Sequence, residues 1–268
     1  MSVPLVSIIT PCYNDGNYIL ECIECVKNST YDNIEHIIID DGSTDKETVE
    51  ILENLSRGNI HLIRTENQGV CKARQQAILD SSGKYILPLD ADDLISRDYI
   101  SLGVKELESD NDISLIVTDY KLFGQYNKTV KLEPYSLERL LGHNLFINTS
   151  LYRRTAFDRV GGYNENMKDG LEDWDFWINI LKDGGKVKKI DGIHFFYRIK
   201  KKAYSRNANI DKKKHEILRR QIWENHREVF SQVFLNPLET FEYLRISTSK
   251  EYIIGRLLLK PLKKILRK

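Results

Sequence analysis

The first part of the chain alternates short apolar runs with segments whose apolar residues recur at helical spacing. Such runs are typical of buried strands, and the segments between them are typical of amphipathic helices. Strands that alternate with helices of about three turns predict parallel βαβ units with right-handed crossovers. The expected strands are 5–10, 35–40, 60–64 and 85–90, and the expected helices are 17–27, a helix capped by Ser43 or Thr44, and 69–80.

The pattern is less regular after residue 112. We expect strands at 114–120, 144–154 and 194–199, and the second of these carries the polar residues Asn148, Thr149 and Ser150. A helix is expected over 171–184, and its apolar spacing turns one face toward the core, with Trp174, Trp177, Ile178 and Leu181. After residue 200 the sequence indicates helices rich in basic residues.

Charge is distributed unevenly along the 268 residues, although the net charge is only +1. Residues 200–268 contain 18 Lys and Arg against 7 Asp and Glu, a net charge of +11, so the first 199 residues carry −10. A basic tail on an acidic body favours contact with an anionic partner. The composition is otherwise ordinary for a soluble globular protein that buries a core, with 41% hydrophobic and 29% charged residues.

The cysteines and the N-terminus indicate a reducing compartment. Cys22 and Cys25 have C-x-x-C spacing, but no second pair or nearby His completes a zinc site. We interpret all four cysteines as free thiols. The N-terminus lacks the regions of a signal peptide, and no run of about 18 apolar residues predicts a membrane span. The expected location is the cytoplasm.

Polar residues follow three of the expected strands, at the point where each strand ends. They occupy residues 11–14, 40–43 and 90–93. In open α/β sheets, ligands bind beyond the carboxyl ends of the parallel strands. We therefore expect the three clusters to line one edge of the sheet and to form a binding site there.

Three carboxylates crowd the third cluster, which reads DADD from Asp90 to Asp93. Like charges this close repel one another, and a cation offsets the repulsion. Oxygen ligands suit Mg²⁺ or Mn²⁺, which commonly bridge protein carboxylates to substrate phosphates. The alternative is a solvated acidic turn. The D-x-D spacing by itself leaves both open, and its place at a strand end beside two other polar strand ends favours the metal.

Other polar strand ends and one helix start also carry candidate chemistry. Asp41 can accept a hydrogen bond from the N–H of a nucleobase, and Tyr13 can stack on a base. Glu172 and Asp173 begin an expected helix, where a carboxylate is a reasonable general base. Each has a plainer alternative: a tight turn for Asp41, a packed rim aromatic for Tyr13, and helix capping for the acidic pair.

Five motifs in order resemble the family 2 inverting glycosyltransferases of the GT-A fold, of the kind that builds bacterial surface polysaccharides: VSIITPCYND, IIIDDGSTD, ENQGVCKARQQAI, YILPLDADD and GLEDWDFW. The match covers about residues 5–200. The resemblance implies an α/β fold with a mostly parallel central sheet flanked by helices. The implied units are a nucleotide-sugar-binding half at 1–110, an acceptor-binding half of the same domain at 111–205, and a basic helical extension at 206–268.

The resemblance also implies roles for single residues. The implied catalytic base is Asp173, with Glu172 and Trp174 on the acceptor side. Asp92 is the implied metal ligand, with Asp90 beside it nearer the donor, and Asp93 supports the motif. The implied donor-binding residues are Pro11, Tyr13, Asp41, Lys72, Arg74, Asp90 and Asp92. Lys72 and Arg74 are two candidates for one basic contact to the donor.

The implied reaction is a single displacement that needs Mn²⁺ or Mg²⁺. Asp173 takes the proton of an acceptor hydroxyl, whose oxygen attacks the anomeric carbon from the face opposite the nucleotide. The metal then stabilises the departing diphosphate. This chain departs from the family pattern at the end of the late strand. Many relatives have Y-R-x-H there, and this chain has Lys200 in place of the histidine. A protonated lysine cannot ligate a metal, so the third protein contact to the metal is an open question.

The implied partners are a nucleotide-sugar donor, first of all a UDP-hexose or UDP-N-acetylhexosamine, and a glycan or polyprenyl-linked acceptor. Residues 250–268 have the composition of an interfacial helix on an anionic membrane, which favours peripheral contact of this cytoplasmic protein with the inner face of the cell membrane. The alternative is a helix that packs on the body with its Lys and Arg outward. The tail lacks the interleaved aromatics of a nucleic-acid-binding surface. The alternative function is a degenerate protein that binds a nucleotide sugar without transferring it.

Overall fold

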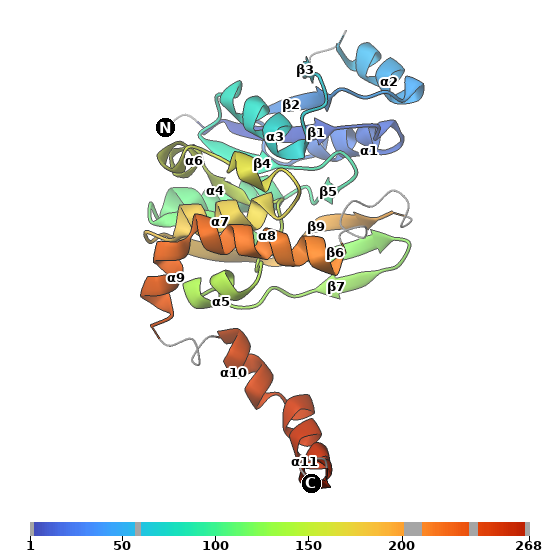
Figure 1. Cartoon of the computed structure of the whole chain (residues 1–268). Coiled ribbons are helices and arrows are strands. Elements are labelled where there is room, and N and C mark those ends of the chain that lie inside the picture. Colours follow the sequence, from blue (N-terminus) through green and yellow to red (C-terminus); the bar gives the residue numbers. More distant parts are fainter. Residues whose placement is uncertain (1–2, 57–59, 201–210, 236–240, 266–268) are drawn as a thin grey trace.

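The structure is a computed structural model that describes residues 3–56, 60–200, 211–235 and 241–265. Its described strands form one nine-stranded sheet (Figure 1). They are β1 (Val6–Cys12), β2 (Ile34–Asp41), β3 (His61–Thr65), β4 (Tyr85–Pro88), β5 (Leu94–Ile95), β6 (Ile113–Gly124), β7 (Lys128–Val130), β8 (Leu151–Arg153) and β9 (Lys186–Ile199). The strand order is β3-β2-β1-β4-β8-β6-β9-β5, and β7 pairs with β6.

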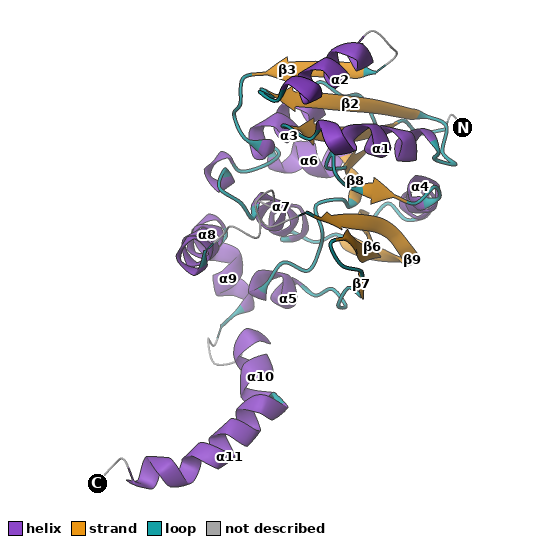
Figure 2. Cartoon of the chain, turned by 90° about the vertical axis from the view of Figure 1, so that its right-hand side faces the viewer, coloured by secondary structure: helices purple, strands orange, loops and turns teal. Residues whose placement is uncertain are grey.

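Helices cover both faces of this sheet (Figure 2). Those of the first half are α1 (Gly16–Lys27), α2 (Lys46–Ser56), α3 (Val70–Leu79) and α4 (Tyr99–Ser109). The second half adds α5 (Leu137–Gly142), α6 (Arg154–Val160), the 3₁₀ helix η1 (Glu165–Met167) and α7 (Glu172–Leu181). The C-terminal helices are α8 (Lys212–Asn225), α9 (Arg227–Val233), α10 (Phe241–Thr248) and α11 (Lys250–Ile265).

The first four strands are parallel, as the alternation of strands and helices predicts. β1 pairs with β2 from Val6 opposite Ile34 to Cys12 opposite Asp40, and β4 and β3 join in the same direction. The carboxyl ends of β1, β2 and β4 therefore reach one edge of the sheet. Beyond β4 the sheet is mixed, because β8 runs antiparallel to both β4 and β6 while β6 and β9 are parallel.

Two local predictions are wrong. The strand expected over 144–154 shrinks to β8, because Ser150 folds back onto the carbonyls of Asn148 and Ile147, at 2.8 Å from its N–H and 2.9 Å from its hydroxyl. The cap of α2 is neither Ser43 nor Thr44. Asp45 accepts the N–H of Thr48 at 2.9 Å, while Ser43 accepts a bond from the β1–α1 loop.

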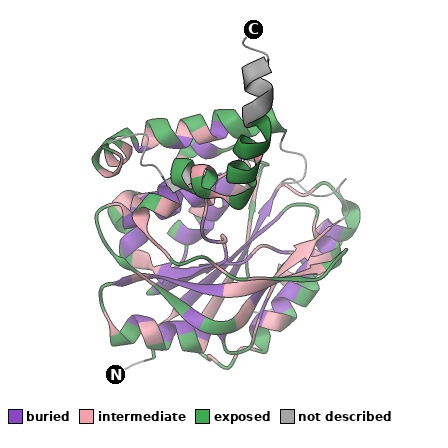
Figure 3. Ribbon diagram, turned by 90° about the horizontal axis from the view of Figure 1, so that it is seen from below, coloured by how far each residue is buried: buried purple, intermediate pink, exposed green. Residues whose placement is uncertain are grey.

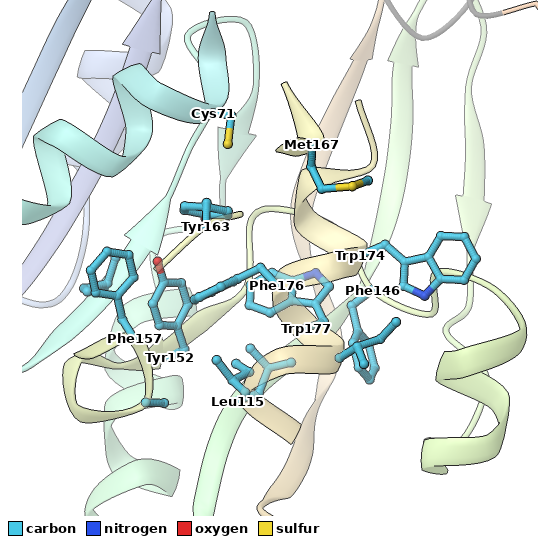
Figure 4. Packing of buried hydrophobic residues seen from close by; sticks show 14 of the residues in the cluster. Cys71, Leu115, Phe146, Tyr152, Phe157, Tyr163, Met167, Trp174, Phe176 and Trp177 are labelled. Carbon is cyan, nitrogen blue, oxygen red and sulfur yellow. The ribbon is translucent and has the colours of Figure 1, made fainter. Parts of the chain in front are cut away.

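A hydrophobic cluster surrounds α7 and makes that helix rigid. Trp174, Trp177, Ile178 and Leu181 are buried, as their spacing predicts. Figure 4 shows Phe176 and Trp177 against Tyr152, with ring centroids 5.3 and 5.7 Å apart in edge-on geometry. Such aromatic pairs contribute about 0.5–1.5 kcal/mol each beyond burial. The start of α7, which carries Glu172 and Asp173, is therefore held by the core.

The C-terminal helices divide into a packed part and an exposed part. Leu218 and Ile222 of α8 are buried in the cluster around α7. In Figures 1 and 2, α10 and α11 extend away from the sheet, and Figure 3 shows the described side chains of this part as mostly exposed. Within the described ranges, no helix combines the length and the apolar character that a membrane crossing requires.

Candidate active site

A cavity of about 610 Å³ opens at the edge where the parallel strands end. Its walls come from α3, the loop after β4, the loop before β8, β6, β9 and the starts of α7 and α8. Its polar lining includes Arg74, Asp90, Asp93, Asn144, Asn148, Glu172 and Asp173. The fold thus brings Asp90 and Asp173, which are far apart in the sequence, into one cavity.

The loops after β1 and β2 are tied together by Asn14. Its backbone has φ 56°, a left-handed conformation that Asn tolerates better than most residues. The side-chain oxygen of Asn14 accepts the backbone N–H groups of Thr44 at 2.8 Å and Asp45 at 2.9 Å. The backbone N–H of Asn14 donates to the hydroxyl of Ser43. The two loops therefore hold one position, and Tyr13 stands beside them with 45% of its surface exposed.

Asp41 lies buried at the end of β2, where it holds the loop before α3. Its two carboxylate oxygens accept the N–H groups of Gln68 and Gly69, both at 2.9 Å. Gly69 has φ 90°, which only glycine adopts without strain. The oxygen that accepts Gln68 also faces the Thr65 hydroxyl at 3.5 Å, while the other keeps a second lone pair through which Asp41 can accept a bond from a ligand. Pro11 is buried within β1 opposite Ile39.

Arg74 joins the strand-end motif to the start of α7. Its side chain is 1% exposed, and its two terminal nitrogens lie 3.0 Å from Asp90 and 3.3 Å from Glu172. Burial opposes its charge, but the two carboxylates more than compensate and raise the pKa of Arg74. Lys72, the other basic candidate, is half-exposed, lies 3.8 Å from Glu165 and does not line the cavity.

Asp173 is a partly buried carboxylate with two donors. One oxygen accepts the N–H of Trp174 at 2.8 Å, and the other accepts the side-chain amide of Asn144 at 3.0 Å. Burial first and the neighbouring Glu172 second raise the pKa of Asp173 to about 6. A carboxyl group with a pKa near neutrality suits proton transfer.

The residues that flank the acidic pair of α7 differ in what they contribute. Leu171, just before the pair, has φ 58°, a left-handed conformation that is strained for leucine, and it lines the cavity. Trp174 is buried, and its indole N–H donates to the carbonyl of Leu140 at 2.6 Å. Trp174 does not line the cavity, so its acceptor-side role stays a prediction.

The loop after β4 places its three carboxylates in different surroundings. Asp90 faces Arg74 and the cavity. The carboxylate of Asp92 lies 2.8 Å from the ammonium of Lys200. Asp93 is buried and accepts the N–H of Arg198 at 2.8 Å; burial and its two acidic neighbours raise the pKa of Asp93 well above the usual value.

Comparison with known proteins identifies the family. Residues 7–168 match the model of glycosyl transferase family 2, and residues 138–202 match a model described as the N-terminal domain of galactosyltransferase. The chain belongs to glycosyl transferase family 2.

Two relatives illustrate the range of this glycosyltransferase family. A chondroitin synthase of Pasteurella multocida is 26% identical over 261 residues, which cover 95% of this chain and 26% of the relative. An uncharacterized glycosyltransferase of Haemophilus influenzae is 34% identical over 194 residues, which cover 68% of this chain and 74% of the relative. The chain therefore spans about a quarter of the length of the chondroitin synthase.

Solved structures confirm the GT-A fold. The crystal structure of S. aureus TarS 1–349 in complex with UDP-GlcNAc matches with a TM-score of 0.65 at 17% identity, over 92% of this chain and 74% of that one. A mannosyltransferase from Pyrobaculum calidifontis in complex with GDP-Man and Mn²⁺ matches with a TM-score of 0.59 at 18% identity, over 91% and 68%. At these identities the likeness establishes the fold alone.

The family resemblance raises the question whether these side chains fit a divalent metal. A cation at Asp90 and Asp92 needs carboxylate oxygens that are free to coordinate it. Here Arg74 forms an ion pair with one oxygen of Asp90, and Lys200 forms an ion pair with one oxygen of Asp92. Among the described residues, no cluster of three His, Cys, Asp or Glu side chains is arranged to hold a metal. Arg74 and Lys200 thus bring two positive charges to the carboxylates that a metal at Asp92 would use, which disfavours a metal at this position of this glycosyltransferase.

The sequence did not indicate two contacts of the site. Asn144 holds Asp173, but it belongs to a stretch whose pattern indicated a strand. Asp15 lies 2.5 Å from Lys200, across the sheet edge. No motif marks Asn144, and although Asp15 ends the motif VSIITPCYND, its pairing could not be foreseen, because each residue acts through a partner that is remote in the sequence.

Proposed function

We propose that this family 2 glycosyltransferase moves a sugar, with inversion, from a nucleotide-diphosphate donor to a hydroxyl of a glycan or lipid-linked oligosaccharide. The observation that carries the proposal is the cavity that holds Asp90 and Arg74 at the strand ends together with Asp173 at the start of α7. UDP-sugars are the first candidates, because TarS, a structural neighbour, was crystallised in complex with UDP-GlcNAc. The relatives named chondroitin synthase support polysaccharide synthesis as the setting.

In the proposed reaction, Asp173 accepts the proton of the acceptor hydroxyl. The acceptor oxygen forms a bond to the anomeric carbon, the bond from that carbon to the diphosphate oxygen breaks, and its electron pair leaves with the diphosphate. Asn144 and the N–H of Trp174 orient the carboxylate of Asp173 for this task. Arg74 contributes positive charge on the donor side of the cavity.

Donor binding tests this proposal directly. We expect UDP, UDP-sugars or GDP-mannose to raise the unfolding temperature of the chain, and Tyr13→Ala to weaken that nucleotide's binding by about 5- to 150-fold, the range for loss of one base–aromatic stack. Isothermal titration calorimetry measures the affinity, and Tyr126→Ala, at another exposed tyrosine, is the control. Binding without transfer or hydrolysis of any nucleotide sugar would favour the alternative, a degenerate binding protein.

The pH dependence of transfer follows from Asp173. Burial and Glu172 raise the pKa of Asp173 to about 6, and only its deprotonated form accepts a proton. We therefore expect the transfer rate to fall about tenfold per pH unit below pH 6 and to level off above it. Initial rates between pH 5 and 8, with donor affinity measured at each pH, check this. A rate that stays flat down to pH 5 would show that another group is the base.

We further propose that α11 contacts the anionic inner face of the cell membrane, where a lipid-linked acceptor would lie. Exposed apolar side chains stand on α11 next to Lys250 and Arg256, and they include Ile253, Ile254, Leu257 and Leu258. This combination is typical of interfacial helices.

Vesicle binding tests the proposed membrane contact. We expect the full chain to sediment with phosphatidylglycerol vesicles, and a double change of Ile254→Glu and Leu258→Glu to weaken that binding by about tenfold or more, because two apolar side chains no longer enter the membrane. Ile217→Glu, at an exposed position of α8, is the matched control. If the double variant binds as the wild type does, α11 is not the contact.

A further inference from the structure

We infer that Lys200 is a built-in cation of the donor site, so that this chain binds the diphosphate of its donor without a divalent metal at Asp92. The inference rests on the proposed function above, because it concerns how the loop of Asp90 and Asp93, which line the cavity, and its neighbour Lys200 hold a nucleotide diphosphate. It departs from the metal that the family resemblance implies.

Lys200 lies between two carboxylates. Its ammonium is 2.5 Å from Asp15 at the β1–α1 loop and 2.8 Å from Asp92, and its side chain is only 13% exposed. It also lies 5.0 Å from the centre of the Tyr18 ring, a cation–π contact. A lysine between two carboxylates is held as an ammonium, the form that donates to both.

The end of β9 fixes this position. The N–H of Arg198 donates to Asp93 at 2.8 Å, and the guanidinium of Arg198 donates to the backbone carbonyl of Asp92 at 2.7 Å. The guanidinium also pairs with Glu21 of α1 at 2.5 Å. The backbone two residues before Lys200 is therefore attached to the loop that carries Asp92. The anchored strand therefore holds Lys200 next to its two carboxylates, so the ion pair does not depend on a long side chain that moves freely on the surface.

A metal at Asp92 would stand close to the Lys200 ammonium, which lies 2.8 Å from one carboxylate oxygen of Asp92, and two cations this close repel each other. An ammonium has three donors and no lone pair, so Lys200 cannot itself be a metal ligand. A metal at Asp92 would have to tolerate the repulsion or displace Lys200. Displacement would take a largely buried cation from both of its partners, which is unfavourable. Arg74 pairs with the other carboxylate of the motif, Asp90, at 3.0 Å.

The positive charge of these two side chains can take the role that a divalent metal has in holding a diphosphate. Lys200 and Arg74 together carry two positive charges beside the D-x-D motif, the formal charge of one divalent ion, and they also pair with Asp15 and Glu172. Two of the three donors of the Lys200 ammonium meet Asp15 and Asp92, which leaves the third for a phosphate oxygen. Charge-assisted bonds of this kind to phosphate are short and strong. The ligand class is thus a nucleoside diphosphate bound by ammonium and guanidinium groups.

The test is the affinity of the full chain for UDP, with GDP in parallel, measured by titration calorimetry in EDTA and again in excess Mn²⁺. For the wild type, we expect the two dissociation constants of the bound nucleotide to agree within about threefold. Lys200→Gln should weaken binding in EDTA by about 10- to 100-fold, the range for loss of one charge-assisted bond. Lys186→Gln, at an exposed ion pair at the other end of β9, should change neither value.

The outcomes separate this inference from the proposed function. Nucleotide binding by the wild type that is lost in EDTA and restored by Mn²⁺ overturns the inference but leaves the proposed function intact. Lys200→Gln that binds in EDTA as the wild type does also overturns it. No nucleotide binding under either condition overturns the proposed function itself. The wild-type comparison needs no variant, so it decides even if Lys200→Gln fails to fold.

Discussion

Replacing Asp173 with Asn is expected to lower the rate of sugar transfer by about 10²- to 10⁴-fold, the usual contribution of a general base. An amide of the same shape cannot accept the proton of the acceptor hydroxyl. The amide oxygen can still accept a bond from the N–H of Trp174, so α7 should keep its place. Donor affinity should therefore change by less than about threefold. Rates come from transfer assays at saturating donor, and affinity comes from titration calorimetry.

Two comparisons make the Asp173 result specific. Asp183→Asn changes an exposed carboxylate just beyond the other end of α7 and should leave the rate unchanged. Glu172→Gln removes the buried one of the two carboxylates that pair with Arg74 and should lower stability as well as rate, whereas Asp173→Asn should mainly lower the rate. If Asp173→Asn transferred sugar at the wild-type rate, or if it lost donor affinity while keeping normal transfer chemistry, Asp173 would not be the base.

The strand ends show what could be predicted from the sequence. Buried apolar runs separated by amphipathic helices predict parallel strands, and parallel strands must bring their carboxyl ends to one edge. That geometry needs no knowledge of side-chain contacts, and the structure confirms it for β1, β2 and β4. The buried face of α7 could be predicted equally well, because four large apolar residues at helical spacing leave little choice of orientation.

Contacts between remote side chains could not be predicted in the same way. Lys72 and Arg74 are two residues apart on α3, so they face roughly opposite sides of the helix. The sequence permits either one to enter the site, and only the packing of α3 on the sheet selects Arg74. The sequence shows Lys200 only as a departure from a motif. Its pairing with Asp15 and Asp92 could not be predicted, because it depends on how the end of β9 meets two loops.

The strand predicted over 144–154, which forms the loop before β8, was wrong for a different reason. Its apolar and β-branched residues have strand propensity, but propensity is weaker than local hydrogen bonds in a buried turn. Ser150 and Asn148 close such a turn, and Asn144 uses its side chain to bind Asp173. Polar residues within an apparent strand were thus part of the site.

Replacing Arg74 with Ala is expected to have the largest effect on stability of any single change in the site. The guanidinium is buried between Asp90 and Glu172, and it also lies over the Tyr163 ring at 5.6 Å. Removal leaves two carboxylates near each other without a cation, and breaking a buried pair in this way costs about 3–5 kcal/mol. Urea unfolding followed by tryptophan fluorescence measures the loss.

Two variants separate the charge of Arg74 from its size. Arg74→Lys keeps the charge, but one ammonium cannot span both carboxylates as the planar guanidinium does, so we expect a loss between those of the wild type and Arg74→Ala. Adding Glu172→Gln to Arg74→Ala removes one unpaired carboxylate, so the double variant should be less destabilised than the sum of the two single changes. Strict additivity, or an Arg74→Ala chain as stable as the wild type, would contradict the role of Arg74 as the buried cation that joins Asp90 to α7.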